Sequence, residues 1–271
     1  MRKEWIIGAH LEIICGDVPH PQKRPQRGET MSKNKEDILS QVREIPCPYK
    51  IPVAEMIERY EKLYTGALID IFQDINLHNQ WLGPQVKCLT KDLRLETIAG
   101  FAFTIQWIFD PGPDERERIA AKMVESYPRG SIVVVDTGAD KTSGFWGELA
   151  TTTCLNHGVR GAVINGGAKD TGFVKAMGFP IFAKFSSPVD GFHRSRLRGW
   201  QLPIWFDEVL VRPWDFLVCD NDGCLLVPQE RAEEILVKAE ARKESENSTR
   251  NLLKKGVSAE EAVLRTGRKD L

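Results

Sequence analysis

Three ionisable residues at a fixed separation are the feature of this sequence that most directly suggests chemistry. Glu148 lies within the segment WGELA (146–150), and after twenty intervening residues Lys169 and Asp170 close the segment GAVINGGAKD (161–170). Twenty residues suffice for a helix and the next parallel strand, so both ends can return to the same edge of a sheet. We therefore expect an acid, a base and a second acid to converge at one edge.

The elements around these residues suggest how a ligand would be held. A helix predicted over 145–157 would present unpaired backbone N–H groups at its first turn, where a substrate carboxylate could bind. The same helix is expected to bury one stripe of side chains: Trp146, Leu149, Thr153, Cys154 and His157. Gly166 and Gly167 predict a tight turn in which the backbone approaches a ligand.

The rest of the chain alternates helix and strand patterns, which predicts an α/β fold. Helices are expected over 53–64, 66–73 and 115–125, and near residue 173. Strands are expected over 98–108, 131–136, 161–165 and 180–185. A hairpin is expected from strands 216–219 and 224–227, because the DNDG sequence between them is a turn signal. A final helix is expected from Pro228 until just before Gly256.

The chain divides into three predicted parts. Residues 1–35 are expected to form a flexible extension, because the segment from 20 to 35 is rich in proline and charge. Met31 opens a polar stretch typical of a protein start, so residues 1–30 are either foreign to the fold or a genuine arm. Residues 36–256 form the predicted catalytic domain, and 257–271 a tail. The final helix is polar beyond Ala239, which predicts a solvated extension or an arm laid across a neighbour.

Composition excludes several classes of function. The 37 basic and 38 acidic residues nearly cancel, which argues against nucleic acid and anionic membranes as partners. No apolar run reaches the roughly 18–20 residues that span a bilayer. The six cysteines form no CxxC pair, which predicts reduced thiols and a cytoplasmic protein. The five histidines show no zinc-binding spacing.

Further segments occur in order around the acid-x20-Lys-Asp motif: IAGFAFT (98–104), GSIVVVD (130–136), GFPIFA (178–183) and VRPWDFLVCDNDG (211–223). This series resembles the RraA-like proteins, which include the 4-hydroxy-4-methyl-2-oxoglutarate aldolases and the regulator of ribonuclease E activity. The resemblance covers roughly residues 53–256. It implies a single domain with a swivelling β/β/α fold and a C-terminal helical arm. It also implies a homotrimer or hexamer with its sites between subunits.

The resemblance implies a lyase that cleaves a carbon–carbon bond of a 4-hydroxy-2-oxo acid. In the aldolase members a divalent ion, Mg²⁺ or Mn²⁺, stabilises the pyruvate enolate, and oxaloacetate decarboxylation leaves the same enolate. By position, Asp170 would bind the metal and Lys169 the substrate, and Glu148 would be the acid–base candidate. The backbone amides of Gly147, Glu148, Leu149 and Ala150 would hold the substrate carboxylate. Glu246 is the acid expected to reach a neighbour's metal.

This sequence departs from the family pattern at Lys169, where the family carries arginine. Lysine is a compact point charge that does not reproduce the planar two-pronged guanidinium, so the substrate could differ. Asn165 and Trp214 also stand where many members carry aspartate and glycine. The main alternative is therefore a non-catalytic protein-binding regulator of a ribonuclease. A methyltransferase is disfavoured, since no glycine-rich cofactor loop follows the first strand.

Each site residue also has a structural interpretation. Asp170 could cap the following helix, Lys169 could form an ordinary ion pair, and Glu148 could offset the charge at the helix N-terminus. A Schiff base at Lys169 is disfavoured. The segment 193–198, with His193, Arg194, Arg196 and Arg198, is expected to be a loop that either binds an anionic substrate or is simply solvated, and we favour solvation. The tryptophans Trp200, Trp205 and Trp214 are expected in the core or an interface, and Cys219 and Cys224 as buried apolar residues.

Overall fold

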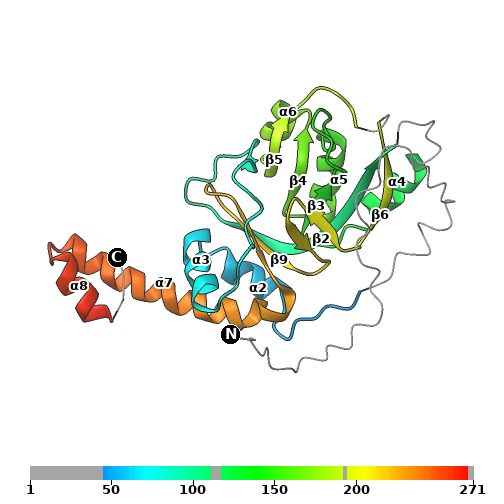
Figure 1. The fold of residues 1–271 in the computed structure, drawn as a ribbon. Helices are drawn as coiled ribbons and strands as arrows, with labels where there is room; N and C mark the ends of the chain where they lie inside the picture. Colours follow the sequence, from blue (N-terminus) through cyan, green and yellow to red (C-terminus); the bar gives the residue numbers. More distant parts are fainter. Residues whose placement is uncertain (1–44, 111–116, 192–193, 268–271) are drawn as a thin grey trace, which may run out of the picture. The chain divides into compact units, whose positions relative to one another are not determined.

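A mixed eight-stranded sheet forms the centre of the fold in the computed structural model, which describes residues 45–110, 117–191 and 194–267 (Figure 1). The strand order is β1-β5-β4-β3-β2-β9-β10, and β6 pairs with β2. The strands are β1 Lys87–Cys88, β2 Ile98–Phe109, β3 Ser131–Asp136, β4 Gly161–Ala168, β5 Ile181–Ser186, β6 Ser195–Trp200, β9 Phe216–Cys219 and β10 Cys224–Val227. The prediction for residues 1–35 falls outside the described residues, and so does His193.

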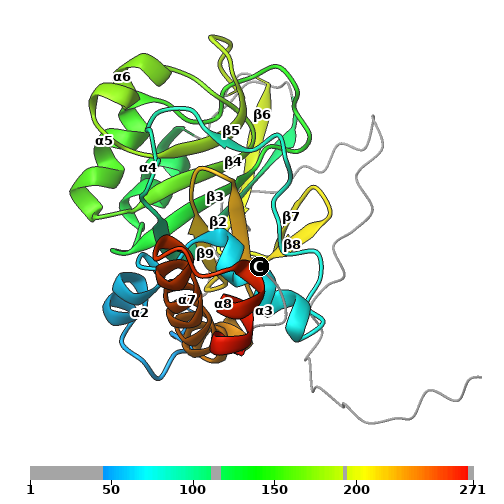
Figure 2. The same cartoon turned by 90° about the vertical axis from the view of Figure 1, so that its left-hand side faces the viewer.

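Strands β2 to β5 are parallel, and a helix connects each to the next. These helices are α4 Glu117–Glu125, α5 Glu148–His157 and α6 Thr171–Ala176. Because crossovers between parallel strands share one hand, the three helices cover the same face of the sheet. Side chains from α4, α5 and α6 join one core cluster with the strands. The β7–β8 hairpin (Ile204–Phe206 and Val209–Val211) covers the opposite face (Figure 2).

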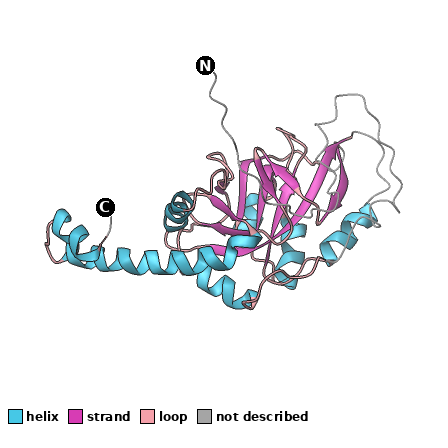
Figure 3. Ribbon diagram, turned by 60° about the horizontal axis from the view of Figure 1, so that its bottom comes forward, coloured by secondary structure: helices cyan, strands magenta, loops and turns pink. Residues whose placement is uncertain are grey.

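The remaining helices pack around β9 and β10. Helices α2 Val53–Tyr60, α3 Thr65–Asp74 and the first part of α7 Ala232–Lys254 share a second core cluster with these strands. Ile235, Leu236 and Ala239 are fully buried there, as the apolar pattern predicts. The rest of α7 extends beyond the strands, and α8 Ala259–Thr266 packs against it (Figure 3). No helix in the described ranges is long and apolar enough to cross a membrane.

Three local predictions are wrong. Gly166 and Gly167 form no turn but continue β4, where a Cβ at Gly167 would lie 2.4 Å from the Phe185 ring. Part of the predicted loop 193–198 is strand β6, which pairs with β2 and places Arg196 3.1 Å from Asp110. On α5 the predicted stripe fails because Leu149 is 79% exposed. Thr151 is buried there instead, beside Cys154.

The tryptophan and cysteine predictions hold in part. Trp200 is buried, and Trp214 stacks on Phe101 with the ring centroids 4.2 Å apart. Trp205 is 41% exposed on the β7–β8 hairpin, so it lies outside the core of this chain, and its expected place in an interface stays a prediction. Cys219 and Cys224 are fully buried, as expected of small apolar side chains.

Candidate functional site

Asp170 lies at the junction between β4 and α6. It occupies the position before α6 with φ of 54°, a left-handed conformation that is uncommon outside glycine. Its side chain makes no capping hydrogen bond with α6. The carboxylate turns instead towards α5, where Oδ2 accepts a hydrogen bond of 3.4 Å from the backbone N of Glu148. The geometry thus gives no support to the helix-capping interpretation.

The N-terminus of α5 is held directly against the Lys169–Asp170 pair. The backbone N of Lys169 donates to the Trp146 carbonyl at 2.7 Å, and Phe145 N donates to the Gly167 carbonyl at 2.9 Å. Gly147 precedes α5, and a Cβ at this position would lie 2.5 Å from Asp170 Oδ2. The two ends of the twenty-residue interval therefore meet at one edge of the sheet, as their spacing predicts.

The first turn of α5 supplies hydrogen-bond donors to this edge. The backbone N of Thr151 closes the turn on the Gly147 carbonyl at 3.1 Å. The amides of Glu148, Leu149 and Ala150 precede it, and helix geometry leaves such first-turn amides without an intrahelical acceptor. Glu148 Oε1 accepts a hydrogen bond of 3.1 Å from Thr152 Oγ1, one turn along the helix. These amides can hold an anion, and the Glu148 carboxylate lies at the same end of the helix.

Lys169 pairs with an acid that the sequence did not single out. Its Nζ lies 2.8 Å from Asp190 Oδ2, and the two side chains are 30% and 41% exposed. The hydrogen bond that Lys169 donates to Asp190 raises the pKa of Lys169, and the charges of Asp190 and Asp170 raise it further, although partial burial opposes these effects. The amine is therefore held as an ammonium, which favours a charge-stabilising role over a Schiff base.

Asp190 belongs to a loop after β5 that is tied to the other side of the site. Gly144 N donates to the Val189 carbonyl at 2.7 Å, and Gly191 N donates to the Gly144 carbonyl at 3.3 Å. The only local signals in this segment are turn-forming residues, Pro188 and the Asp190–Gly191 pair. They predict a loop but give no indication of the partner of Asp190.

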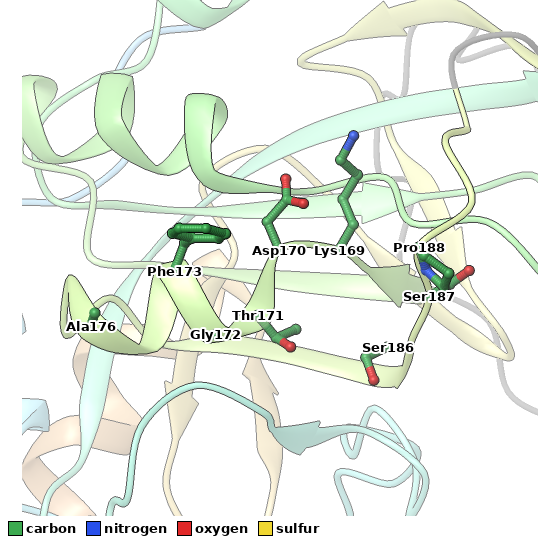
Figure 4. A pocket seen from close by; sticks show the side chains of 9 residues that line it. All are labelled: Lys169, Asp170, Thr171, Gly172, Phe173, Ala176, Ser186, Ser187 and Pro188. Carbon is green, nitrogen blue, oxygen red and sulfur yellow. The ribbon is translucent and has the colours of Figure 1, made fainter.

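A pocket of about 590 Å³ opens beside these residues. Figure 4 shows the side chains of Lys169 and Asp170 projecting to the same side at the end of β4. Lys169 is the single basic residue among the described residues that line the pocket. The described residues that line it are Lys169, Asp170, Thr171, Gly172, Phe173, Ala176, Ser186, Ser187 and Pro188. The pocket thus combines one ion pair with hydroxyl and apolar surfaces.

Glu246, the other predicted metal ligand, lies elsewhere in the chain. It is on α7, 12% exposed, with its carboxylate 3.8 Å from Arg242 and 4.0 Å from Arg250. Figure 1 shows α7 at the opposite end of the sheet from α6. One chain does not bring Glu246 to Asp170, so its role as a ligand stays a prediction that requires a second copy.

The donor set restricts which metal could fit. Within the described ranges, no group of three or more His, Cys, Asp or Glu side chains could hold a metal ion. Asp170 offers one exposed carboxylate. This arrangement does not fit zinc, which takes three or four protein ligands. It does fit a hard ion such as Mg²⁺, which keeps several waters and uses one or two carboxylates.

Comparison with known proteins identifies the family. The family model "RraA-like: Aldolase/RraA" matches residues 65–226, which is more than half of the chain. Protein DlpA of Legionella pneumophila is 26% identical over 165 residues, covering 61% of this chain and 27% of that protein. A Halalkalibacterium halodurans protein named "Putative 4-hydroxy-4-methyl-2-oxoglutarate aldolase" is 28% identical over 142 residues, covering 52% of this chain and 67% of that protein.

A solved structure supports the same assignment. An uncharacterized protein from Pseudomonas syringae superposes with a TM-score of 0.70 and 26% identity, covering 83% of this chain and all of that one. The present chain spans about a quarter of DlpA and about two thirds of the Halalkalibacterium protein. The expected fold class, a mixed α/β single domain, is confirmed by this likeness. The chain belongs to the RraA-like family.

Proposed function

We propose that this chain is a divalent-metal-dependent lyase that cleaves a carbon–carbon bond of a 4-hydroxy-2-oxo acid and releases pyruvate. Relatives named as aldolases of this type support the proposal. The observation that carries it is the position of Asp170, whose carboxylate lies 3.4 Å from the backbone N of Glu148 at the N-terminus of α5. A carboxylate, the Lys169 cation and the remaining first-turn amides of α5, those of Leu149 and Ala150, thereby lie at one edge of the sheet.

Each residue has a defined part in the proposed reaction. The first-turn amides of α5 bind the substrate carboxylate, and Glu148 accepts the proton of the 4-hydroxyl. The C3–C4 bond then breaks, a carbonyl product leaves, and its electron pair passes to the oxygen of the 2-oxo group. Lys169 stabilises that developing negative charge as a permanent cation. A proton returned to C3 completes pyruvate, so atoms and electrons balance without an oxidant.

A metal ion would be held by Asp170 and would supply polarisation of the 2-oxo group. The same arrangement would serve oxaloacetate decarboxylation, in which carbon dioxide is the leaving group. The proposal includes a homotrimer or hexamer in which Glu246 of a neighbour completes the site. Sedimentation showing a monomer at working concentration would count against that part. A cytoplasmic location is also proposed, and the free state of the five described cysteines fits a reducing compartment.

The test is a screen for pyruvate release from oxaloacetate and several 4-hydroxy-2-oxo acids, with Mg²⁺ or Mn²⁺ and with excess chelator. We expect turnover that disappears with chelator and in Asp170→Asn. Asp74→Asn is the matched control, because Asp74 is an exposed acid at the end of α3, remote from the pocket. Chelator-resistant turnover, or full activity of Asp170→Asn, would overturn the proposal.

A protein-binding regulator remains the second candidate, because one observation favours it. The ammonium of Lys169 is already paired with Asp190 at 2.8 Å, whereas a site for an anionic substrate usually offers an uncommitted cation. The same screen separates the two functions. A folded protein that releases no pyruvate from any of these acids with either metal would favour the regulator.

A further inference from the structure

The charge around the proposed site is strongly unbalanced. Asp170 and Asp190 contribute two carboxylates beside Lys169, and Glu148 contributes a third at the N-terminus of α5, whereas Lys169 is the one ammonium among the described residues that line the pocket. Three other cations close in sequence to the lining residues, Lys175, Lys184 and Arg194, do not line the pocket, and Lys184 pairs with Asp207. Arg194 donates instead to Thr142 Oγ1 at 3.3 Å. Among the described residues that line the pocket, Lys169 therefore carries the single positive charge, and Asp190 offsets it.

The remaining walls of the pocket are uncharged. Phe173 and Ala176 come from α6, and Pro188 comes from the loop after β5. The Phe173 ring is 72% exposed beside Asp170 (Figure 4). An exposed aromatic side chain in a pocket favours an apolar ligand group, since burying it removes apolar surface from water on both sides.

We propose that Asp190 makes this pocket favour 2-oxo acids that carry one carboxylate and an apolar remainder over dicarboxylic 2-oxo acids, so that oxaloacetate would be a poorer substrate than such an acid. The inference rests on the proposed function and specifies its substrate class. The first carboxylate binds the α5 amides and Lys169. A second carboxylate would enter a space lined by Phe173, Ala176 and Pro188, with no described cation to pair with it and with Asp190 repelling it. Discrimination by an opposed charge of this kind is a common source of specificity.

The excess of carboxylates around the pocket also gives a reason for lysine at position 169. An arginine can grip two acceptors at once through its planar fork, whereas lysine is a point charge that one carboxylate largely occupies. Asp190 at 2.8 Å takes one of the donor directions of the ammonium. Lysine paired with Asp190 therefore matches a ligand with one negative charge better than a dicarboxylate with two.

Binding of two uncleavable probes of similar size tests the inference. Neither 2-oxo-4-methylpentanoate nor 2-oxoglutarate has a 4-hydroxyl group, so calorimetry with the full chain and Mg²⁺ measures binding without turnover. We expect Kd for 2-oxoglutarate to be at least about tenfold higher, equivalent to ~1.4 kcal/mol. Asp190→Asn should reduce that ratio about tenfold, because it removes the repelling charge and releases Lys169.

Asp207→Asn is the matched control. Asp207 forms the same kind of pair, with Lys184 Nζ 2.6 Å from its Oδ2, but Lys184 does not line the pocket as Lys169 does, so loss of this pair should leave the ratio unchanged. A second variant, Ala176→Lys, adds a cation to an exposed wall position and should also lower the ratio, which guards against misfolding of Asp190→Asn.

Equal or tighter binding of 2-oxoglutarate by the wild type would overturn the inference. A ratio unmoved in both folded variants would do the same. Because the probes are not cleaved, the binding experiment can contradict the proposed selectivity while pyruvate release from other acids still supports the proposed function. Conversely, absence of turnover on every acid tested would remove the proposed function whatever the probes show.

Discussion

Substitution of Gly147 by alanine would displace the Asp170 carboxylate without removing it. Gly147 has φ of −155°, an extended conformation that alanine adopts without strain. Its Cβ would, however, lie 2.5 Å from Asp170 Oδ2 and 3.1 Å from Lys169 Cγ. Because the Asp170 side chain is exposed and its hydrogen bond from Glu148 N is long, at 3.4 Å, the carboxylate can move more easily than the backbone.

The size of the effect follows from that distance. Restoring an ordinary contact of 3.4 Å from 2.5 Å requires a movement of about 0.9 Å. A misplacement of about 1 Å in a catalytic arrangement can cost about 100-fold in rate. We therefore expect kcat of Gly147→Ala to fall about 100-fold, equivalent to ~2.7 kcal/mol. The free energy of unfolding should change by less than about 1 kcal/mol, because an exposed side chain absorbs the clash.

Steady-state pyruvate release and urea denaturation of the same preparations measure both quantities. Gly66→Ala is the matched control, because Gly66 is an exposed glycine in the first turn of α3 whose Cβ would meet only the Tyr64 ring, at 3.3 Å. It should leave kcat unchanged. Wild-type kcat in Gly147→Ala would refute the reasoning, since the position of the Asp170 carboxylate would then not matter. A large loss of stability would show that the backbone moved instead.

Three further predictions concern other residues. Lys169→Ala should lower kcat with little change in metal affinity by calorimetry, whereas Lys169→Arg should retain turnover; borohydride trapping of a lysine adduct would contradict both. Glu240 accepts bonds of 2.8 and 2.7 Å from Arg59, which lower its pKa below the ordinary 4.5. The stabilisation from this ion pair is therefore present above pH 4.5 and is lost as the pH falls below it. Glu240→Gln should lower the free energy of unfolding by at most about 1 kcal/mol in urea denaturation at neutral pH and should leave it unchanged in acid. A difference in unfolding free energy that does not depend on pH would contradict this. Iodoacetamide should alkylate the exposed Cys47 in the native protein but not the buried Cys154, because burial raises the pKa of the Cys154 thiol. Peptide mass spectrometry measures both modifications, and faster alkylation of Cys154 than of Cys47 would contradict the prediction.

Elements whose residues are buried on both faces could be predicted closely from the sequence. The run SIVVVD gives β3 with the predicted bounds, because every residue of this central parallel strand is buried. The hairpin strands β9 and β10 also have their predicted bounds, since the DNDG turn separates two short apolar runs. In both cases local pattern and tertiary environment favour the same conformation.

Contacts between residues far apart in the sequence determine the elements that the sequence did not predict. Strand β6 reads as a polar loop because its arginines look solvated, yet Arg196 pairs with Asp110 and Arg198 donates to Gln106 at 3.1 Å, both near the C-terminal end of β2. Gly167 reads as a turn because glycine permits one, whereas here it leaves space for the Phe185 ring.

The candidate site shows the same division. The spacing of Glu148 and Lys169–Asp170 predicted their meeting, because a helix and a parallel strand return the chain to one sheet edge. Asp190 could not be predicted as the partner of Lys169. Its place depends on how the loop after β5 hydrogen-bonds to Gly144, a contact between residues more than forty positions apart. The departure at Lys169 was visible in the sequence, but the ion pair that accompanies it was not.

The most direct test of the account is a Mn²⁺ titration of pyruvate release from an aliphatic 4-hydroxy-2-oxo acid, comparing the wild type with Asp170→Asn. We expect saturable activation of the wild type and no turnover without metal. We also expect Asp170→Asn to be inactive or to need at least about tenfold more Mn²⁺, since a carboxylate ligand is lost. Identical activation curves for the two proteins, or turnover that ignores the metal, would contradict the assignment of Asp170.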